Sequence, residues 1–252
     1  MTGKRLQYHS MLIDSFAAPG LGTRGISEAL RRFTAEMPYE RGPILDFVTE
    51  VASDTAPGTT VLDLGAGDAP YRELFGHTSY MTSDWEKSVH AGGRRADIVA
   101  SAAALPIESS SIGIVLCTQV LEHVADPGEV LHECLRVLEP HGRLALTVPL
   151  VWQLHELPHD YYRYTPAGIE HLLSQAGFVD IEIRARNDSF TTLAQLMLNV
   201  GSTIGRAPDG LNERRQQAQE IMSLLADQVA RLAPLDINRT MPLGYAARAR
   251  HP

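Results

Sequence analysis

The chain has 252 residues, of which 44% are hydrophobic and 21% are charged, a composition that is typical of a soluble globular protein and excludes a disordered or low-complexity chain. A formal net charge of −8 argues against a nucleic-acid binder with a broad basic face, and two isolated cysteines argue against a disulfide scaffold. We recognise no secretory leader and no membrane-spanning stretch, so we expect a cytoplasmic protein.

The first 55 residues are predicted to be helical. Apolar residues recur at helical spacing from Ile26 to Met37, and Pro38 is expected to end that helix. A second amphipathic run follows Gly42 and Pro43. Because this segment precedes the alternating core, we expect residues 1–55 to form an N-terminal helical lid.

Residues 56–187 are predicted to alternate short strands with helices, as one α/β core. The expected strands are residues 60–64, 80–84, 97–99, 112–117, 143–148 and 178–183. Asp126 and Pro127 indicate a helix start between the fourth and fifth strands, and a further helix is expected from Thr165 to Gly177. Strands without polar alternation are typical of a parallel sheet that is buried on both faces.

Residues 188–236 depart from this alternation. They contain an uncharged run and then a long amphipathic helix, and we expect them to form a helical insertion or lid. Residues 237–252 contain an apolar run, which predicts a final strand of the core sheet. Open sheets of this kind bind ligands outside the carboxyl ends of their strands.

The loop after the first strand carries the most specific local pattern. Asp63 ends the strand, and Gly65 and Gly67 allow a tight turn and a close approach of the backbone to a ligand. Asp84 ends the second strand, where a carboxylate can accept hydrogen bonds from both hydroxyls of a ribose. Pro70 stands where a dinucleotide fingerprint has its third glycine, so a nucleoside ligand without phosphates fits better than NAD.

The stretch from Val61 to about Phe178 resembles the class I S-adenosylmethionine-dependent methyltransferases, and most of all a small bacterial type associated with glycan or natural-product biosynthesis. The resemblance covers about half of the chain, and it implies a Rossmann-like, doubly wound sheet of seven mostly parallel strands with an antiparallel last strand. It rests on the segments VLDLGAGDAPYRELF, SDW, ALPIESSSIGIVLCTQVLEHVADP, LRVLEPHGRLALTVP, LHELPHDYYRYTPAGIEHLLSQAGF and MPLGYAARARHP.

The resemblance implies S-adenosylmethionine as cofactor and S-adenosylhomocysteine as product. Gly65, Ala66 and Gly67 would pass under the methionine moiety, with Asp63 orienting that loop, and Asp84 would hold the ribose. Other expected cofactor contacts surround these: Trp85, Ser101, Ala102, Gln119 and Arg41. The family usually has an aspartate where this chain has Ser101. We therefore do not expect a carboxylate contact to the adenine amine at this position.

Methyl transfer needs an aligned acceptor and, for an acceptor of high pKa, a general base. His159 and His123 follow strand ends on the side where the methyl group should project, and we expect His159 before His123 to be that base. Asp160 would orient His159 or pair with Arg163. His155, Tyr161, Tyr162 and Arg163 are expected to contact the acceptor.

A metal site is not expected. His155 and His159 are four residues apart, but Pro158 interrupts a helical two-histidine face. The sequence thus predicts a methyltransferase that acts on an oxygen or nitrogen of a small, sugar-bearing or natural-product molecule. A protein or peptide methyltransferase and a non-catalytic binding or regulatory protein remain alternatives. A homodimer is possible, and neither nucleic acid nor a membrane span is expected.

Overall fold

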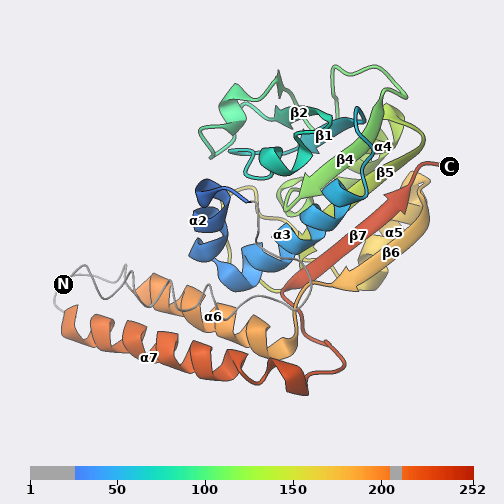
Figure 1. The fold of residues 1–252 in the computed structure, drawn as a ribbon. Coiled ribbons are helices and arrows are strands. Elements are labelled where there is room, and N and C mark those ends of the chain that lie inside the picture. The colour runs from blue at the N-terminus through green and yellow to red at the C-terminus, as the bar shows by residue number, and fades with distance from the viewer. Residues whose placement is uncertain (1–25, 205–211) are drawn as a thin grey trace.

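The structure is a computed structural model that describes residues 26–204 and 212–252. One sheet of seven strands forms its centre, in the order β3-β2-β1-β4-β5-β7-β6 (Figure 1). β1 to β5 pair in parallel, and β7 runs antiparallel to both of its neighbours, which confirms the predicted sheet. The strands are β1 Thr60–Leu64, β2 Ser79–Asp84, β3 Ile98–Val99, β4 Ile112–Thr118, β5 Leu138–Pro149, β6 Val179–Ala185 and β7 Gly244–Arg250.

Helices cover both faces of this sheet (Figure 1). α2 (Glu28–Glu36) and α3 (Pro38–Ser53) bury their apolar side chains against one face, and α4 (Pro127–Val137) and α5 (Pro166–Ala176) cover the other. Neighbouring residues of β1 show why a central strand is apolar on both faces, because Val61 packs into the α3 side and Leu62 into the α4 and α5 side. The caps that the sequence indicates at Asp126 and Thr165 are present.

The helix boundary in the N-terminal segment differs from the prediction. Pro38 begins α3 instead of only ending the previous helix, and α3 continues through Pro43. Pro43 has no N–H to donate to the carbonyl of Tyr39, four residues earlier. The Asn187 side chain donates to that carbonyl at 2.5 Å, so a residue from the end of β6 replaces the missing helix bond.

α6 (Ser189–Ile204) and α7 (Asn212–Ala230) form a hairpin beside α3, away from the sheet (Figure 1). A small cluster of Tyr39, Ala194, Ala226 and Leu243 joins the hairpin to the rest of the molecule. The expected insertion is therefore helical, while residues 1–25 of the expected lid and residues 205–211 lie outside the described residues. Within the described part of the chain, no helix is long and apolar enough to span a membrane.

Candidate functional site

The carboxyl ends of β1, β2, β4 and β5 meet at one edge of the sheet, and their loops touch one another. Gly65 and Gly67 both adopt positive φ, at 68° and 56°. A Cβ on Gly65 would overlap the side chain of Val120, which follows β4. Glycine is therefore required at position 65 by backbone conformation and by the close approach of the neighbouring loop.

Asp84 connects this glycine turn to the end of β2. Its Oδ2 accepts hydrogen bonds from the Gly67 amide at 2.9 Å and from the Ser88 hydroxyl at 3.3 Å, and its Oδ1 accepts from the Trp85 amide at 2.8 Å. A Cβ on Gly93 would overlap the same carboxylate. The segment from Ser88 to Gly93 thus lies directly against a buried acidic group that faces the glycine turn.

Asp63 is fully buried at the end of β1. The Tyr80 hydroxyl donates to its Oδ2, and its Oδ1 has no hydrogen-bond partner among the described residues. Burial raises the pKa of Asp63 to about 7, and the Tyr80 bond opposes that shift only in part. The Asp63 carboxyl group therefore faces the interior, with its hydrogen bond to Tyr80 of β2.

The other expected cofactor residues differ in their burial and in the contacts that they already make. The Trp85 ring is half-buried and meets the His159 ring edge-on, with centroids 4.9 Å apart. Ser101 is exposed, and Ala102 packs at the edge of the main core. The Gln119 amide donates to the Thr147 hydroxyl at 3.0 Å.

Arg41 is engaged within the N-terminal helices. Its guanidinium donates to the Phe33 carbonyl at 2.7 Å and to Glu36 at 2.5 Å, and it lies over the Phe33 ring. A role in holding a cofactor carboxylate would require this group to leave both partners. The structure therefore brings Gly65, Gly67, Asp63 and Asp84 together and places Arg41 in its own network.

The segment after β5 crosses the short helix η3 (Leu121–His123) and is tied to it by backbone bonds. The amides of Tyr161 and Tyr162 donate to the Glu122 carbonyl, and the Tyr162 hydroxyl donates to the Ala125 carbonyl. The ring nitrogen Nδ1 of His159 lies 3.2 Å from the Tyr161 hydroxyl. These bonds place the predicted acceptor contacts over η3 and next to Trp85.

Asp160 pairs with Arg163, one of the two roles expected for it. The two side chains make bonds of 2.7 and 3.0 Å, and the Asp160 carboxylate also accepts from the His155 amide. The Arg163 guanidinium holds the pKa of Asp160 well below its usual range. Both charged groups therefore fix the shape of the loop, with His155 turned toward η3.

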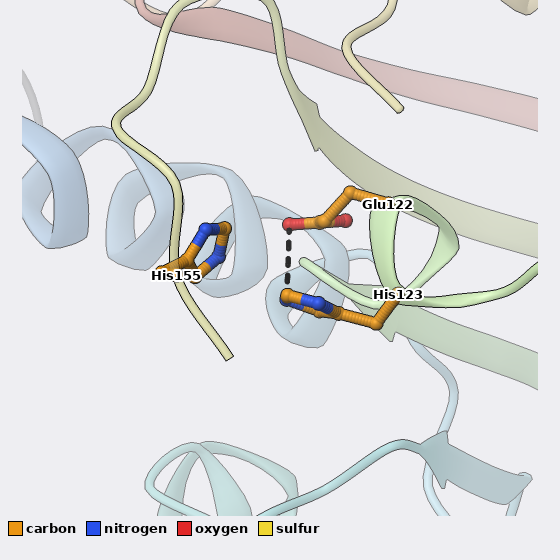
Figure 2. Close-up of side chains that lie close together, drawn as sticks. All are labelled: Glu122, His123 and His155. Carbon is orange, nitrogen blue, oxygen red and sulfur yellow. Dashed lines mark ion pairs between the residues drawn. The ribbon is translucent and has the colours of Figure 1, made fainter. Parts of the chain in front are cut away.

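His155, His123 and Glu122 gather beside η3, as Figure 2 shows. Glu122 has 1% of its side chain exposed, and neither carboxylate oxygen has a hydrogen-bond partner among the described residues. Burial is the largest cause that raises its pKa, to about 8. Sequence reasoning named the two histidines as site residues and missed Glu122, although it stands directly before His123.

A buried ion pair lies on the same side of the molecule and was also missed. Arg186, at the end of β6, donates to Glu40 of α3 at 3.1 Å. Both side chains are almost fully buried, and 146 positions separate them in the chain. No local pattern could have paired them, since only the packing of α3 on β6 brings them together.

Comparisons with known proteins agree with this geometry. Residues 62–146 match the family model of a methyltransferase domain. An uncharacterized methyltransferase of Mycobacterium ulcerans is 30% identical over 145 residues, which cover 48% of this chain and 56% of the relative. An uncharacterized transposon protein of Streptomyces fradiae is 34% identical over 113 residues, covering 39% and 32%. The chain spans about half the length or less of these curated relatives.

Solved structures show the same fold at low sequence identity. A methyltransferase of Archaeoglobus fulgidus aligns with a TM-score of 0.53 at 17% identity, covering 87% of this chain and 98% of that one. Phosphoethanolamine N-methyltransferase 2 of Haemonchus contortus gives 0.52 at 16%, covering 82% and 52%, and the cyclase SpnF gives 0.52 at 19%, covering 84% and 82%. Residues 62–146 therefore match a methyltransferase domain, and the chain has the fold of the solved S-adenosylmethionine-dependent methyltransferases.

Proposed function

We propose that this chain binds S-adenosylmethionine across the carboxyl ends of β1, β2 and β4 and transfers its methyl group to an oxygen or nitrogen of a small molecule, a sugar-bearing or natural-product intermediate, leaving S-adenosylhomocysteine. The hydrogen bond from Gly67 to Asp84 carries the proposal. It holds the carboxylate beside the glycine turn, where it can accept hydrogen bonds from the two hydroxyls of a ribose.

When a ribose binds, its hydroxyl groups replace part of the hydrogen bonds that the Asp84 carboxylate already accepts. A carboxylate has about four acceptor positions, and the amides of Gly67 and Trp85 and the Ser88 hydroxyl use three of them here. The Ser88 bond is the longest at 3.3 Å, so a ribose hydroxyl replaces it at the lowest cost. We expect the segment from Ser88 to Gly93 to shift outward when the cofactor binds.

The remaining cofactor contacts follow from the same placement. Ala66 lies between the two glycines under the methionine moiety, with Gln119 beside it and Asp63 beneath it. Trp85 stacks on the adenine, since its half-buried ring meets His159 at a steep angle and has no parallel ring partner among the described residues, with only the Lys87 ammonium over it at 5.9 Å. Ser101 and Ala102 close the adenine side. Arg41 reaches the methionine carboxylate only if it releases Glu36.

The segment after β5 supplies the acceptor side. The His159 ring contacts the Trp85 ring, so it lies beside the proposed cofactor site, and we assign it the role of general base. His123 ranks second because its Nδ1 is already bound to the His159 carbonyl at 2.6 Å. Tyr161 and Tyr162 are exposed beside Leu157 and offer aromatic and apolar surface to a small acceptor.

Two segments outside the alternating core would cover the acceptor. They are residues 1–55 and 188–236, which flank the core in the sequence, and their described helices α3 and α6 touch each other.

A homodimer is also proposed, because Ile221 and Leu224 of α7 are apolar and exposed. The cytoplasmic location that the sequence indicates stays a prediction.

A labelled-methyl screen tests the proposed function. The protein is incubated with methyl-labelled S-adenosylmethionine and a panel of small amines and hydroxyl-bearing sugars and natural products, with a peptide library in parallel. We expect label in a small molecule. Label in peptides alone would contradict the small-molecule assignment. Cofactor binding without transfer to any acceptor would favour the non-catalytic alternative.

A further inference from the structure

Glu122, His123 and His155 form the one group of three metal-ligating side chains found in the described part of the chain. One donor atom of each lies within 4.8 Å of the other two (Figure 2). Two of them come from η3 and the third from the segment after β5, so the group exists only when that segment folds across η3. This set shares only His155 with the pair of His155 and His159, whose helical two-histidine face Pro158 interrupts.

Glu122 is the observation that points to a ligand. Both of its oxygens are buried without a hydrogen bond from any described residue, and an uncompensated buried carboxylate is costly. Arg163 and Arg186 lower the pKa of Glu122 only in part and donate no hydrogen bond to it, because Arg163 is paired with Asp160 and Arg186 with Glu40. A cation that binds between Glu122 and the histidines would supply the missing partner.

Both histidine rings are held in the form that binds a metal ion. The Nδ1 of His123 lies 2.6 Å from the His159 carbonyl, which can only accept, so this nitrogen carries the proton and Nε2 keeps its lone pair. That Nε2 lies 4.0 Å from a Glu122 oxygen. A ligating histidine that donates its other N–H to a carbonyl is the usual support around a protein metal site.

His155 repeats this arrangement. Its Nδ1 faces two acceptors, the Gln153 carbonyl at 3.2 Å and the Asp160 carboxylate at 3.4 Å, which leaves Nε2 as the unprotonated nitrogen. The His123 and His155 rings lie with their centroids 4.6 Å apart. Donors around a tetrahedral ion with bonds of about 2.0–2.1 Å stand about 3.4 Å apart, so the side chains need to close by roughly 1 Å.

We propose that Glu122, His123 and His155 bind one divalent transition-metal ion, zinc or an ion of similar ligand preference. Two imidazoles and one carboxylate suit zinc and its neighbours, whereas calcium and magnesium select oxygen ligands. Three protein ligands leave at least one position of the ion for water or for an oxygen of another molecule. The site does not depend on the proposed methyl transfer, because its ligands bind the ion without the cofactor.

Zinc titration of the tag-free chain tests the site, after chelator treatment and dialysis and with no S-adenosylmethionine present. Calorimetry should show one zinc ion per chain, cobalt should bind at the same site with a visible absorption band, and magnesium and calcium should not compete. Glu122→Gln and His155→Asn should each weaken zinc binding at least tenfold. His171→Asn, an exposed histidine on α5, is the matched control and should bind as the wild type.

Thermal unfolding separates ligation from a merely structural role. Zinc should raise the Tm of the wild type and of His171→Asn, and this rise should be clearly smaller in Glu122→Gln. The metal-free Tm of Glu122→Gln should stay close to that of the wild type, since neither Glu122 oxygen has a hydrogen-bond partner among the described residues. Absence of zinc binding, or an equal zinc-induced rise in Glu122→Gln, would overturn the proposal whatever the chain does with S-adenosylmethionine.

Discussion

Two buried carboxylates at the same strand edge, Asp84 and Glu122, differ in how many hydrogen bonds they accept. In the glycine half, residues 63–68 and 84–93, the Asp84 carboxylate accepts three hydrogen bonds from the turn and the segment around it. In the histidine half, residues 119–125 and 152–164, both oxygens of Glu122 lack such partners. The Asp84 carboxylate is therefore held in place by the glycine turn, whereas Glu122 has no hydrogen-bond partner among the described residues and is available for a ligand.

The largest expected effect tests whether the histidine half carries the chemistry. His159→Ala should lower kcat by about 10²–10⁴-fold, the range of general-base catalysis, and leave the affinity for S-adenosylmethionine nearly unchanged. The measurement is a steady-state assay with the acceptor that the labelled-methyl screen identifies. His123→Ala is the comparison variant. If His123→Ala loses far more activity than His159→Ala, the order of the two histidines is wrong.

Removal of Arg186 tests how firmly α3 is joined to the sheet beside the histidine half. Arg186→Met should lower the free energy of unfolding by about 3–5 kcal/mol, because Glu40 becomes an unpaired buried charge. Urea unfolding measures it. Arg231→Met, which breaks the exposed pair with Asp227 on α7, is the control and should cost at most about 1 kcal/mol. Equal losses would mean that Glu40 is not held buried.

A pair of glycine substitutions tests the preassembled turn of the glycine half. Gly58 and Gly65 both have positive φ, but a Cβ on Gly58 meets nothing within 4 Å, whereas one on Gly65 overlaps Val120. Both alanine variants should lose about 1–2 kcal/mol through backbone strain. Gly65→Ala should lose a further 1–3 kcal/mol or so through overpacking, measured by urea unfolding. Equal losses would show that the contact with Val120 does not matter.

The smallest expected effect is a pH dependence that comes from Asp63. Its pKa is about 7 in the folded chain against an ordinary value of 3.8, so the folded state holds more protons between these two values. The free energy of unfolding contributed by Asp63 therefore falls as pH rises through this window. Asp63→Asn should flatten that fall. Urea unfolding at pH 5 and at pH 7.5 measures it, and an unchanged slope would contradict the buried carboxyl.

The glycine half and the sheet could be predicted from the sequence because their signals are local. Each of the apolar runs that β1, β2, β4 and β5 occupy is readable by itself, and Gly65, Gly67 and Asp84 stand next to strand ends. The rest depends on distant pairs. The continuity of α3 through Pro43 needs Asn187, and the Glu40–Arg186 pair needs the packing of α3 on β6. Glu122 could not be recognised from the sequence, because only the folded chain brings His155 next to Glu122 and His123.

Binding of S-adenosylmethionine to the Asp84 carboxylate is the central claim, and calorimetric titration of three proteins tests it most directly. Asp84→Ala removes two charge-assisted bonds to the ribose, each worth about 1.5–3 kcal/mol, so Kd should rise by at least tenfold in a variant that stays folded. Asp54→Ala, which removes an exposed carboxylate paired with Arg248, is the control and should bind as the wild type. Equal affinity for the wild type and a folded Asp84→Ala would contradict the account.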